Sequence, residues 1–399
     1  MGDWATDFDI FDPEYVQHPF AIWDELRQVC PVAQSARWGG SYLLTTHADV
    51  LSTAHDVDRF SSSSVLVVPV PFTYDEHGNR SRPVINADPP EHGPERRLML
   101  PFFTRLAAER YREPTREMCR RLLLQFVDDE TVDVAQDYAR QIPTRVIADI
   151  LGLDPERGEE FTEWVRGALE LGLMDSEILR RSREAVESFL DREIERRREE
   201  PGDDLISFLL TAEIHGQSMP LHVLRSTLSL MLVAGIDTTW SAIGAALWHL
   251  ARHSQDRRRL VAEPELIPVA VEEFLRAYSP VTMARVARAD ATVGTTHVEA
   301  GARILLNFPA ANRDPAVFDR PDEVIVDRGV NPHIAFGTGI HRCLGANLAR
   351  MEMQVAIEEF LGAIPEFELS DPAAVAWTGG QVRGPRHVPV RILERPGRP

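Results

Sequence analysis

Apolar residues recur three or four positions apart along most of the chain, with polar residues between them, which is the pattern of amphipathic helices. The helices that this pattern predicts most clearly are Phe20–Gln28, Arg105–Phe126, Gln141–Leu151, Met174–Glu199, Leu221–Arg252, Ile267–Tyr278 and Gly345–Leu361. Short strands are predicted at Tyr42–Thr45, Thr292–Val293, Val298–Glu299, Arg303–Asn307 and Val388–Leu393. Strands and helices do not alternate regularly, so we expect a mainly helical protein with small peripheral β-sheets.

No internal repeat, low-complexity tract or linker divides the sequence, and residues 1–399 are expected to form a single large domain without a fused reductase. Two segments are predicted to be long loops. Ser61–Pro89 carries an apolar cluster, Val65–Phe72, followed by a polar tip, Tyr74–Arg82, and Asn312–Ala335 is rich in Pro, Asp and Arg. Loops of this length in a compact domain are commonly functional. No glycine-rich nucleotide-binding motif follows a predicted strand.

The composition excludes several classes of partner. The chain has 62 acidic and 43 basic residues, a formal charge of −19, so nucleic acids and anionic membranes would be repelled. Every basic residue is an arginine. Three scattered cysteines do not make a disulfide framework, and the acidic N-terminal segment does not resemble a signal peptide. The most apolar segment, Leu221–Leu250, contains charged residues, which favours a buried helix over a membrane span. We therefore expect a cytoplasmic protein.

The segment Phe336–Gly345 has the features of a loop that holds a reactive sulfur. Gly337 and Gly339 permit tight turns, and Cys343 comes directly before a predicted helix whose free N–H groups would favour a thiolate. Gly345 lets the backbone approach closely, and Phe336 offers a flat apolar wall. The alternative is a buried cysteine that acts only as a small apolar residue.

The segment Ala234–Thr239 places an acid and an alcohol within an apolar helix. An isolated buried carboxylate such as Asp237 is costly unless it has a partner or a function. Gly235 weakens the helix, and the Thr238 hydroxyl can bond a carbonyl one turn back, so a locally opened turn could hold water. From these residues alone, a satisfied core carboxylate is an equally good interpretation.

The residues Phe336, Gly339, Cys343 and Gly345 match the spacing Phe-x-x-Gly-x-x-x-Cys-x-Gly, which resembles the haem-binding signature of the cytochrome P450 family. Ala234–Thr239 is similar to the oxygen-activating segment of the same family. The resemblance implies a cytochrome P450 fold, with haem b (iron protoporphyrin IX) as cofactor and the Cys343 sulfur as the ligand of its iron. Phe336, Gly337 and Gly345 would shape the haem-binding loop. Asp237 and Thr238 would be the catalytic residues that deliver protons to bound oxygen.

Further residues match other parts of that family pattern. Glu273 and Arg276 resemble the Glu-x-x-Arg pair that braces the cysteine loop. The family's third partner is often an arginine, but Glu323 stands at the aligned position, which leaves Arg320 and Arg328 as candidates. The haem propionates need cationic partners, and the resemblance assigns them to His92, Arg96, Arg285 and His341. Pro94 makes the register of Arg96 less certain, because proline is tolerated only in the first turn of a helix.

These features together imply a haem-thiolate monooxygenase that inserts one atom of dioxygen into a small, largely apolar organic substrate. The expected pocket residues are Leu66, Ala234, Val281 and Thr282. Electrons would come from a separate ferredoxin and ferredoxin reductase, which we expect to dock on a basic patch of Arg96, Arg97, Arg105, Arg342 and Arg350. A peroxide-driven peroxygenase, a non-catalytic haem-binding protein and a helical scaffold without cofactor remain the alternatives.

Overall fold

The structure is a computed structural model that describes residues 3–72, 74, 78, 81 and 83–394. Its α-helices are α1 Pro13–Gln17, α2 Pro19–Val29, α3 His47–His55, α4 His92–Met99, α5 Arg105–Arg110, α6 Arg112–Phe126, α7 Gln141–Leu151, α8 Gly158–Leu169, α9 Ser176–Glu199, α10 Leu205–Thr211, α11 Leu221–Arg252, α12 Ser254–Ala262, α13 Ile267–Ala277, α14 Phe308–Ala311 and α15 Ala346–Ala363. Most of the described chain outside loops is helical, as the sequence predicts.

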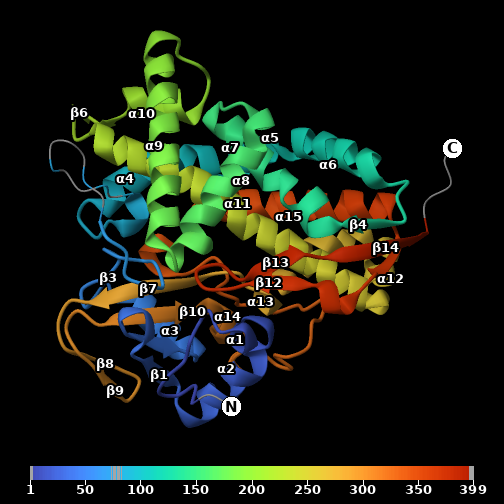
Figure 1. Cartoon of the computed structure of the whole chain (residues 1–399), viewed down its shortest axis with the longest axis horizontal. Helices are drawn as coiled ribbons and strands as arrows, with labels where there is room; N and C mark the ends of the chain where they lie inside the picture. The colour runs from blue at the N-terminus through green and yellow to red at the C-terminus, as the bar shows by residue number, and fades with distance from the viewer. Residues whose placement is uncertain (1–2, 73, 75–77, 79–80, 82, 395–399) are drawn as a thin grey trace.

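The strands are short and peripheral. They are β1 Val32–Ser35, β2 Ser41–Leu44, β3 Phe60–Ser61, β4 Thr131–Asp133, β5 Glu213–Ile214, β6 Gln217–Ser218, β7 Thr282–Ala287, β8 Ala291–Val293, β9 Thr296–Val298, β10 Arg303–Asn307, β11 Glu366–Leu369, β12 Ala376–Thr378, β13 Gly384–His387 and β14 Pro389–Glu394. The largest sheet has the order β1-β2-β10-β7-β3, in which only β10 and β2 pair in parallel. It lies beside the N-terminal helices, at the opposite end of the molecule from α9 and α10 (Figure 1).

Helix α11 runs through the centre of the helical part and packs against α7, α8, α9, α15 and β13 (Figure 1). It is the one helix in the described chain long and apolar enough to cross a membrane, but 67% of that apolar window is buried inside the protein. Its burial on nearly all sides explains why its sequence is apolar without a polar face.

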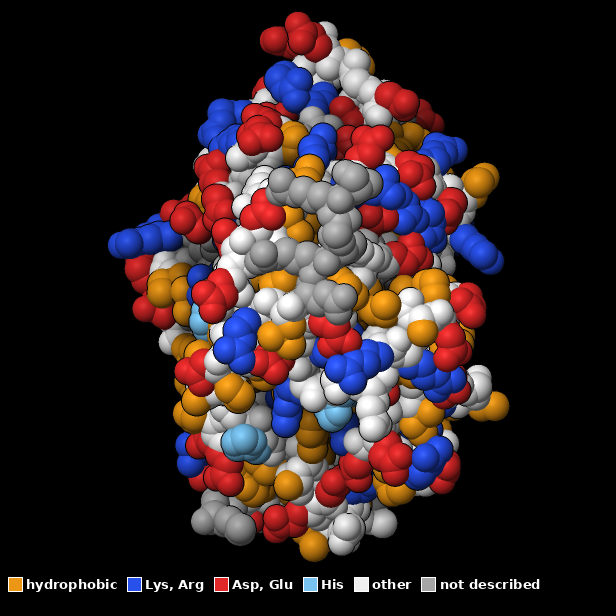
Figure 2. Space-filling model, turned by 90° about the vertical axis from the view of Figure 1, so that its right-hand side faces the viewer, with side chains coloured by type: hydrophobic (Ala, Val, Ile, Leu, Met, Phe, Trp, Pro, Cys, Tyr) orange, Lys and Arg blue, Asp and Glu red, His pale blue; other side chains and the backbone are white. Residues whose placement is uncertain are grey.

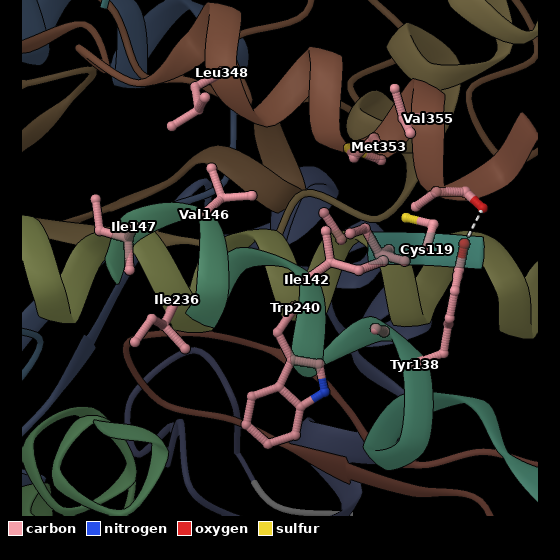
Figure 3. Close-up of a cluster of buried hydrophobic side chains, with 14 of the residues drawn as sticks. Cys119, Tyr138, Ile142, Val146, Ile147, Ile236, Trp240, Leu348, Met353 and Val355 are labelled. Carbon is pink, nitrogen blue, oxygen red and sulfur yellow. Dashed lines mark hydrogen bonds between the residues drawn. The ribbon is translucent and has the colours of Figure 1, made fainter. Parts of the chain in front are cut away.

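The core where α7, α11 and α15 meet is built from Trp240, Ile142, Met353 and their neighbours (Figure 3). The Tyr138 hydroxyl donates a hydrogen bond to the Ala356 carbonyl at 2.8 Å, which satisfies a polar group at the edge of this core. Cys119 lies in the same cluster, and burial raises the pKa of its thiol to about 12. This cysteine therefore plays the purely apolar role that we considered for Cys343.

Several predicted elements differ from the observed ones in detail. The segment Arg105–Phe126 forms two helices, α5 and α6, which separate at Tyr111 so that Pro114 falls in the first turn of α6. The strand expected at Val298–Glu299 is β9, which ends at Val298 and joins β8 through a turn at Gly294. Helix α9 begins at Ser176, because the Asp175 carboxylate accepts the N–H groups of Glu177 and Ile178.

The two segments predicted to be long loops, Ser61–Pro89 and Asn312–Ala335, differ in how much of them the structure describes. Val65–Val70 packs mainly against the N-terminal helices and the interior, but Phe72 is 46% exposed. Residues 75–77, 79–80 and 82 of the predicted polar tip lie outside the described residues. The segment Asn312–Ala335 has no strand and no helix of its own, yet it is fixed by hydrogen bonds to α13.

On the face shown in Figure 2, acidic and basic side chains lie interspersed. Many are paired, as Arg116 is with Glu358 and Glu359. The net charge of −19 is therefore not gathered into one large acidic area on this face.

Candidate functional site

A cavity of about 260 Å³ lies between α11 and the segment that precedes α15. Its lining comes from α4, α11, β7, the loop Ala335–Gly345 and the first turns of α15. Elements far apart in the sequence therefore contribute to one mostly apolar cavity. The sequence-predicted residues that line it are His92, Arg96, Ala234, Thr238, Val281, Arg285, Phe336, Gly337, His341, Cys343 and Gly345.

The loop before α15 presents the Cys343 sulfur to this cavity. Gly337 and Gly339 have positive φ angles of 68° and 71°, which a side chain would strain, and a Cβ at Gly339 would stand 2.8 Å from the Ala54 carbonyl oxygen. The Cys343 N–H donates to the Phe336 carbonyl at 2.8 Å, which closes the loop. Both predicted turns thus serve to bring the sulfur into place.

The electrostatic surroundings of Cys343 act in two directions. Cys343 is accessible from the cavity, but desolvation by the surrounding protein raises the pKa of its thiol, whereas the Gly345 N–H, which hydrogen-bonds the sulfur, and three nearby arginines lower it. Phe336 forms part of the cavity wall, and the Arg350 guanidinium lies 4.4 Å from the centre of its ring. Arg350 is held in that position by Glu272, with N···O distances of 2.6 and 2.8 Å.

Four basic side chains converge at one side of the cavity without an anionic partner among the described residues. Arg285 is 4% exposed and donates only to the adjacent Ala284 carbonyl, at 2.8 Å. The rings of His92 and His341 lie 4.3 Å apart, and the Nε2 atom of each is buried without a hydrogen-bond partner. The fourth, Arg96, lies one turn after His92 on α4, with Pro94 in the first turn of that helix.

Burial and mutual repulsion lower the pKa values of these basic groups. Burial lowers the pKa of Arg285 to about 10. The pKa of His341 falls to about 3, first because of burial and then because of repulsion from Arg285, His92 and Arg96. Unsatisfied buried donors of this kind are expensive. The cluster is therefore suited to an anionic ligand with several acceptor oxygens.

Asp237 faces away from the cavity, toward β13. Its side chain is 1% exposed, and its Oδ1 atom accepts from the Arg386 guanidinium at 2.6 Å, while its Oδ2 atom has no partner. Arg386 also contacts the Glu170 carboxylate, at 3.1 Å, and donates to the Ser241 hydroxyl, at 3.0 Å. Burial raises the pKa of Asp237, and the attraction of Arg386 only partly offsets this effect.

Thr238, the next residue of α11, does face the cavity. Its hydroxyl donates to the Ala234 carbonyl at 2.9 Å, the one-turn-back bond expected from the sequence. Helix α11 nevertheless continues without a break through this turn. Gly235 serves close packing instead of helix opening, because a Cβ there would stand 2.9 Å from Ile147 of α7.

Glu273 and Arg276 are fully buried and form two hydrogen bonds of 2.8 Å with each other. The third partner is Arg328, whose Nε donates to Glu273 at 2.9 Å. Arg320, the other candidate, is exposed and pairs with Glu323 instead. Arg276 and Arg328 also donate to backbone carbonyls of Asn312, Asp319, Arg320, Pro321 and Glu323. The network thereby fixes the loop that leads to Cys343.

A second cavity, of about 250 Å³, adjoins the first and shares Leu230, Ala234, Thr238, Val281 and Met283 with it. Leu66 lines it, as expected. Thr282 lines neither cavity, so its assignment to the pocket was wrong. Successive strand residues point to opposite faces, and in β7 the residues facing the cavity are Met283 and Arg285.

Glu352 was not anticipated from the sequence. It lies on α15, is 2% exposed and lines the first cavity, and its Oε2 atom has no hydrogen-bond partner. Burial raises the pKa of this carboxyl to about 8. The sequence did contain a signal for this residue, because Glu352 is an acid at a helical position that otherwise carries the buried apolar residues of α15.

Comparison with known proteins agrees with this geometry. The family model described as cytochrome P450 matches residues 171–372. The mycinamicin IV hydroxylase/epoxidase of Micromonospora griseorubida is 35% identical over 375 residues, which cover 92% of this chain and 94% of that protein. The chain belongs to the cytochrome P450 family.

Other relatives of this P450 include the vitamin D(3) 25-hydroxylase of Pseudonocardia autotrophica, which is 33% identical over 91% of this chain and 90% of its own length. Among solved structures, the P450 PksS of the Bacillus subtilis bacillaene polyketide synthase has a TM-score of 0.88 at 29% identity, covering 97% of this chain and all of that one. The expected fold and enzyme class, a P450 monooxygenase, are thereby confirmed.

Cytochromes P450 bind haem, and the residues of the first cavity fit it. Cys343 supplies a sulfur to one face of the cavity, and the unpartnered His92 and His341 nitrogens with the unpaired Arg285 match the two propionates of the cofactor. Thiolate-ligated haem supplies the means of reducing dioxygen and transferring one of its oxygen atoms. Thr238 and Ala234 line this cavity together with Cys343 and also line the second cavity.

Proposed function

We propose that this P450 hydroxylates or otherwise oxygenates a mainly apolar molecule that occupies the second cavity. The observation that carries the proposal is that Thr238 and Ala234 line both cavities, so a molecule in the second would reach the residues beside the cofactor. Apolar side chains dominate the inner part of that cavity, among them Leu66, Val281 and Val382. Pockets of this kind select for shape and apolar surface.

Charged side chains of α9 and α11 also line the same cavity and support a more specific proposal. Arg183 of α9 donates to the Pro71 carbonyl at 3.2 Å, and neither Arg183 nor Glu187 makes an ion pair within the described chain. Arg225 lines it too but is paired with Asp191 at 2.6 Å. We infer a substrate whose apolar part lies toward Thr238 and whose polar or charged group lies toward α9. The names of the relatives, which refer to mycinamicin and vitamin D(3), are consistent with sizeable apolar substrates.

A spectroscopic screen tests this proposal directly. The reduced, carbon-monoxide-bound protein should give the spectrum of a thiolate-ligated haem, and Cys343→Ser should abolish it. Apolar compounds with one polar end should then shift the spin state that the absorption spectrum reports. A chain that takes up no haem, or a set of such compounds that never shifts the spectrum, would remove the proposal.

For the catalytic roles, we propose that Thr238 hydrogen-bonds the oxygen species and that Asp237 controls the supply of protons. The Thr238 hydroxyl faces the cavity, while Asp237 connects through Arg386 to Glu170. Glu170 in turn contacts Arg166, whose side chain is 42% exposed. The network thus extends from Asp237, the neighbour of Thr238 on α11, toward solvent. Arginine does not release protons readily, so the proton-accepting atom of this network is the Oδ2 of Asp237, which has no hydrogen-bond partner among the described residues.

We propose that electrons come from a ferredoxin that docks near the cysteine loop. Arg97, Arg105 and Arg342 are exposed there and have no ion-pair partner in the described chain, and the nearby Leu106 is 74% exposed. Arg350, which we had included, is paired with Glu272, and Arg96 lines the cavity. An acidic ferredoxin would complement this smaller basic patch.

Charge reversal of selected arginines tests whether ferredoxin recognises this docking surface or responds only to the net charge of the protein. Arg105→Glu with Arg342→Glu should slow reduction by a ferredoxin and weaken its dependence on salt. The matched control is Arg192→Glu, an exposed arginine of α9 without an ion-pair partner in the described chain. Equal slowing by both changes would contradict the docking site.

A peroxide-driven reaction remains the second candidate, and we propose the dioxygen route because Thr238 presents a hydroxyl to the cavity and the next residue toward the N-terminus, Asp237, is an acid linked toward solvent. Turnover with peroxide alone, faster than with a ferredoxin system, would reverse this preference. We propose that the protein is located in the cytoplasm. Free thiols such as those of Cys30 and Cys119 are typical of that reducing compartment, which would also contain the reduced ferredoxin.

A further inference from the structure

The C-terminal end of α11 carries a group of ligand-type side chains that is separate from both cavities. It consists of His249 and His253, one turn apart, and Asp256 in the first turn of α12. One ligand atom from each lies within 4.8 Å of the other two. None of the three lines the haem cavity or the substrate cavity. The family resemblance did not draw attention to any of them.

His249 is the fixed member of this group. Its side chain is 2% exposed, its Nδ1 atom lies 2.8 Å from the Tyr278 hydroxyl, and its Nε2 atom lies 2.9 Å from Asp256 Oδ2. If Nδ1 carries the proton and donates it to the Tyr278 oxygen, the lone pair of Nε2 is directed at the carboxylate. Such a contact between two acceptors is repulsive unless a cation lies between them.

We propose that His249, His253 and Asp256 bind a divalent transition-metal ion such as Zn²⁺. Zinc lies about 2.0–2.2 Å from imidazole nitrogen and carboxylate oxygen, so two ligands at about 90° to 109° stand about 2.8–3.6 Å apart. The observed separation of 2.9 Å between His249 Nε2 and Asp256 Oδ2 lies within that range. Two imidazoles and one carboxylate suit zinc, nickel or copper better than magnesium or calcium. Water would complete the coordination.

The third ligand can move to complete the site. The His253 ring stacks on the His249 ring with centroids 4.2 Å apart and an angle of 16° between their planes. His253 is exposed and has no side-chain hydrogen bond within the described chain, so a rotation of its side chain costs little. That rotation would turn its nitrogen toward the position between His249 and Asp256.

The surrounding residues support metal binding by His249. The hydroxyl of Tyr278, which follows the last residue of α13, contacts the Nδ1 atom of His249, on the side of the ring away from Asp256. A hydrogen bond at this position typically fixes the ring of a histidine that binds a metal through its other nitrogen. The nearest arginines are directed elsewhere, since Arg252 lies over the Trp248 ring at 4.7 Å and Arg257 donates to the Leu250 carbonyl and to Glu366. A bound ion would therefore tie the end of α11 to α12, with α13 as support.

The test is uptake of Zn²⁺ by the untagged holoenzyme, measured by equilibrium dialysis and titration calorimetry. We expect one bound equivalent and a higher unfolding temperature with zinc than with a chelator. His253→Gln and Asp256→Asn should each weaken binding at least tenfold. Tyr278→Phe should weaken it roughly 10- to 100-fold. The carbon-monoxide spectrum of each variant reports whether the haem domain is intact.

His297→Gln is the matched control, because His297 is an exposed histidine beside Asp290, at 3.9 Å, without a third ligand in the described chain. This variant should bind zinc as the parent does. Two results would overturn the proposal: no zinc uptake by the folded holoenzyme, which would leave only hydrogen bonds from His249, or uptake that His253→Gln and Asp256→Asn do not change. Because His253 is exposed, its substitution gives an answer even if Asp256→Asn is unstable.

Discussion

Asp237 and Arg386 form an almost fully buried ion pair, with 2.6 Å between carboxylate oxygen and guanidinium nitrogen, although 149 residues separate them in the sequence. Arg386 lies over the Trp240 ring at 4.2 Å and divides its hydrogen bonds between Asp237, Glu170 and Ser241. Asp237, to which we assign the supply of protons, is therefore held by the Arg386 guanidinium, which the Glu170 carboxylate also contacts.

Asp237→Asn should reduce turnover by roughly a hundredfold, since general acid–base groups contribute at least about that factor. Haem content and substrate-induced spin shift should remain, because the Asp237 side chain lines neither cavity. Steady-state turnover and a solvent isotope effect are the measurements. A variant that turns over at the parental rate would exclude the proton role.

Arg386→Gln should destabilise the protein by about 3 kcal/mol, because it leaves the buried Asp237 carboxylate without its partner. The double variant Arg386→Gln with Asp237→Asn removes both charges and should recover much of that loss. Denaturant midpoints of the four proteins measure the coupling. Equal effects of Arg386→Gln in both backgrounds would mean that the pair contributes nothing.

Thr238→Ala should leave haem and substrate binding intact and divert electrons to hydrogen peroxide. The Thr238 hydroxyl lines both cavities, whereas Thr239, in the same turn of α11, lines only the first. The ratio of product to reductant consumed, with peroxide assayed separately, checks this expectation. Thr239→Ala is the neighbouring control, although Thr239 is itself largely buried. Unchanged coupling in Thr238→Ala would remove the residue from the mechanism.

Arg328→Gln should cost about 3 kcal/mol of stability and promote haem loss, since it deprives the buried Glu273 of one partner and three backbone carbonyls of a donor. Arg320→Gln removes an exposed ion pair eight residues earlier and should change stability by less than about 1 kcal/mol. Thermal unfolding and the rate of haem transfer to an acceptor protein distinguish the two. Similar losses in both would contradict the assignment of Arg328.

Glu352 gives a prediction about pH. Its pKa of about 8 in the folded protein lies above the ordinary value of 4.5, so the folded state keeps a proton that the unfolded state releases. Between about pH 4.5 and pH 8, each rise of one pH unit should lower the free energy of unfolding by about 1.4 kcal/mol. No further loss from Glu352 is expected above pH 8. Glu352→Gln should remove this dependence, so its stability relative to the parent should increase from pH 5 to pH 8. Parallel pH profiles would contradict the prediction.

The sequence was sufficient for the helical class and for the cysteine loop, because periodicity and the Gly and Cys spacing are local features. It could not choose between Arg320 and Arg328, since the segment between them has no periodicity and is ordered only by contacts with α13. Arg386 could not be connected to Asp237, because pairing of β13 with α11 depends on the whole fold. Thr282 was misassigned by one residue, and in a strand one residue reverses the face. Local patterns thus predicted the residues that bear chemistry, but not their long-range partners.

The hydrogen bonds that Arg276 and Arg328 make to the Asn312–Glu323 backbone have a practical consequence for engineering. New chain ends cannot be opened within that segment without releasing carbonyls that two buried guanidinium groups hold. The β5–β6 hairpin, an exposed turn at His215 and Gly216, lacks such constraints. Circular permutants or inserted domains intended to keep the cofactor in place should therefore be built at that hairpin.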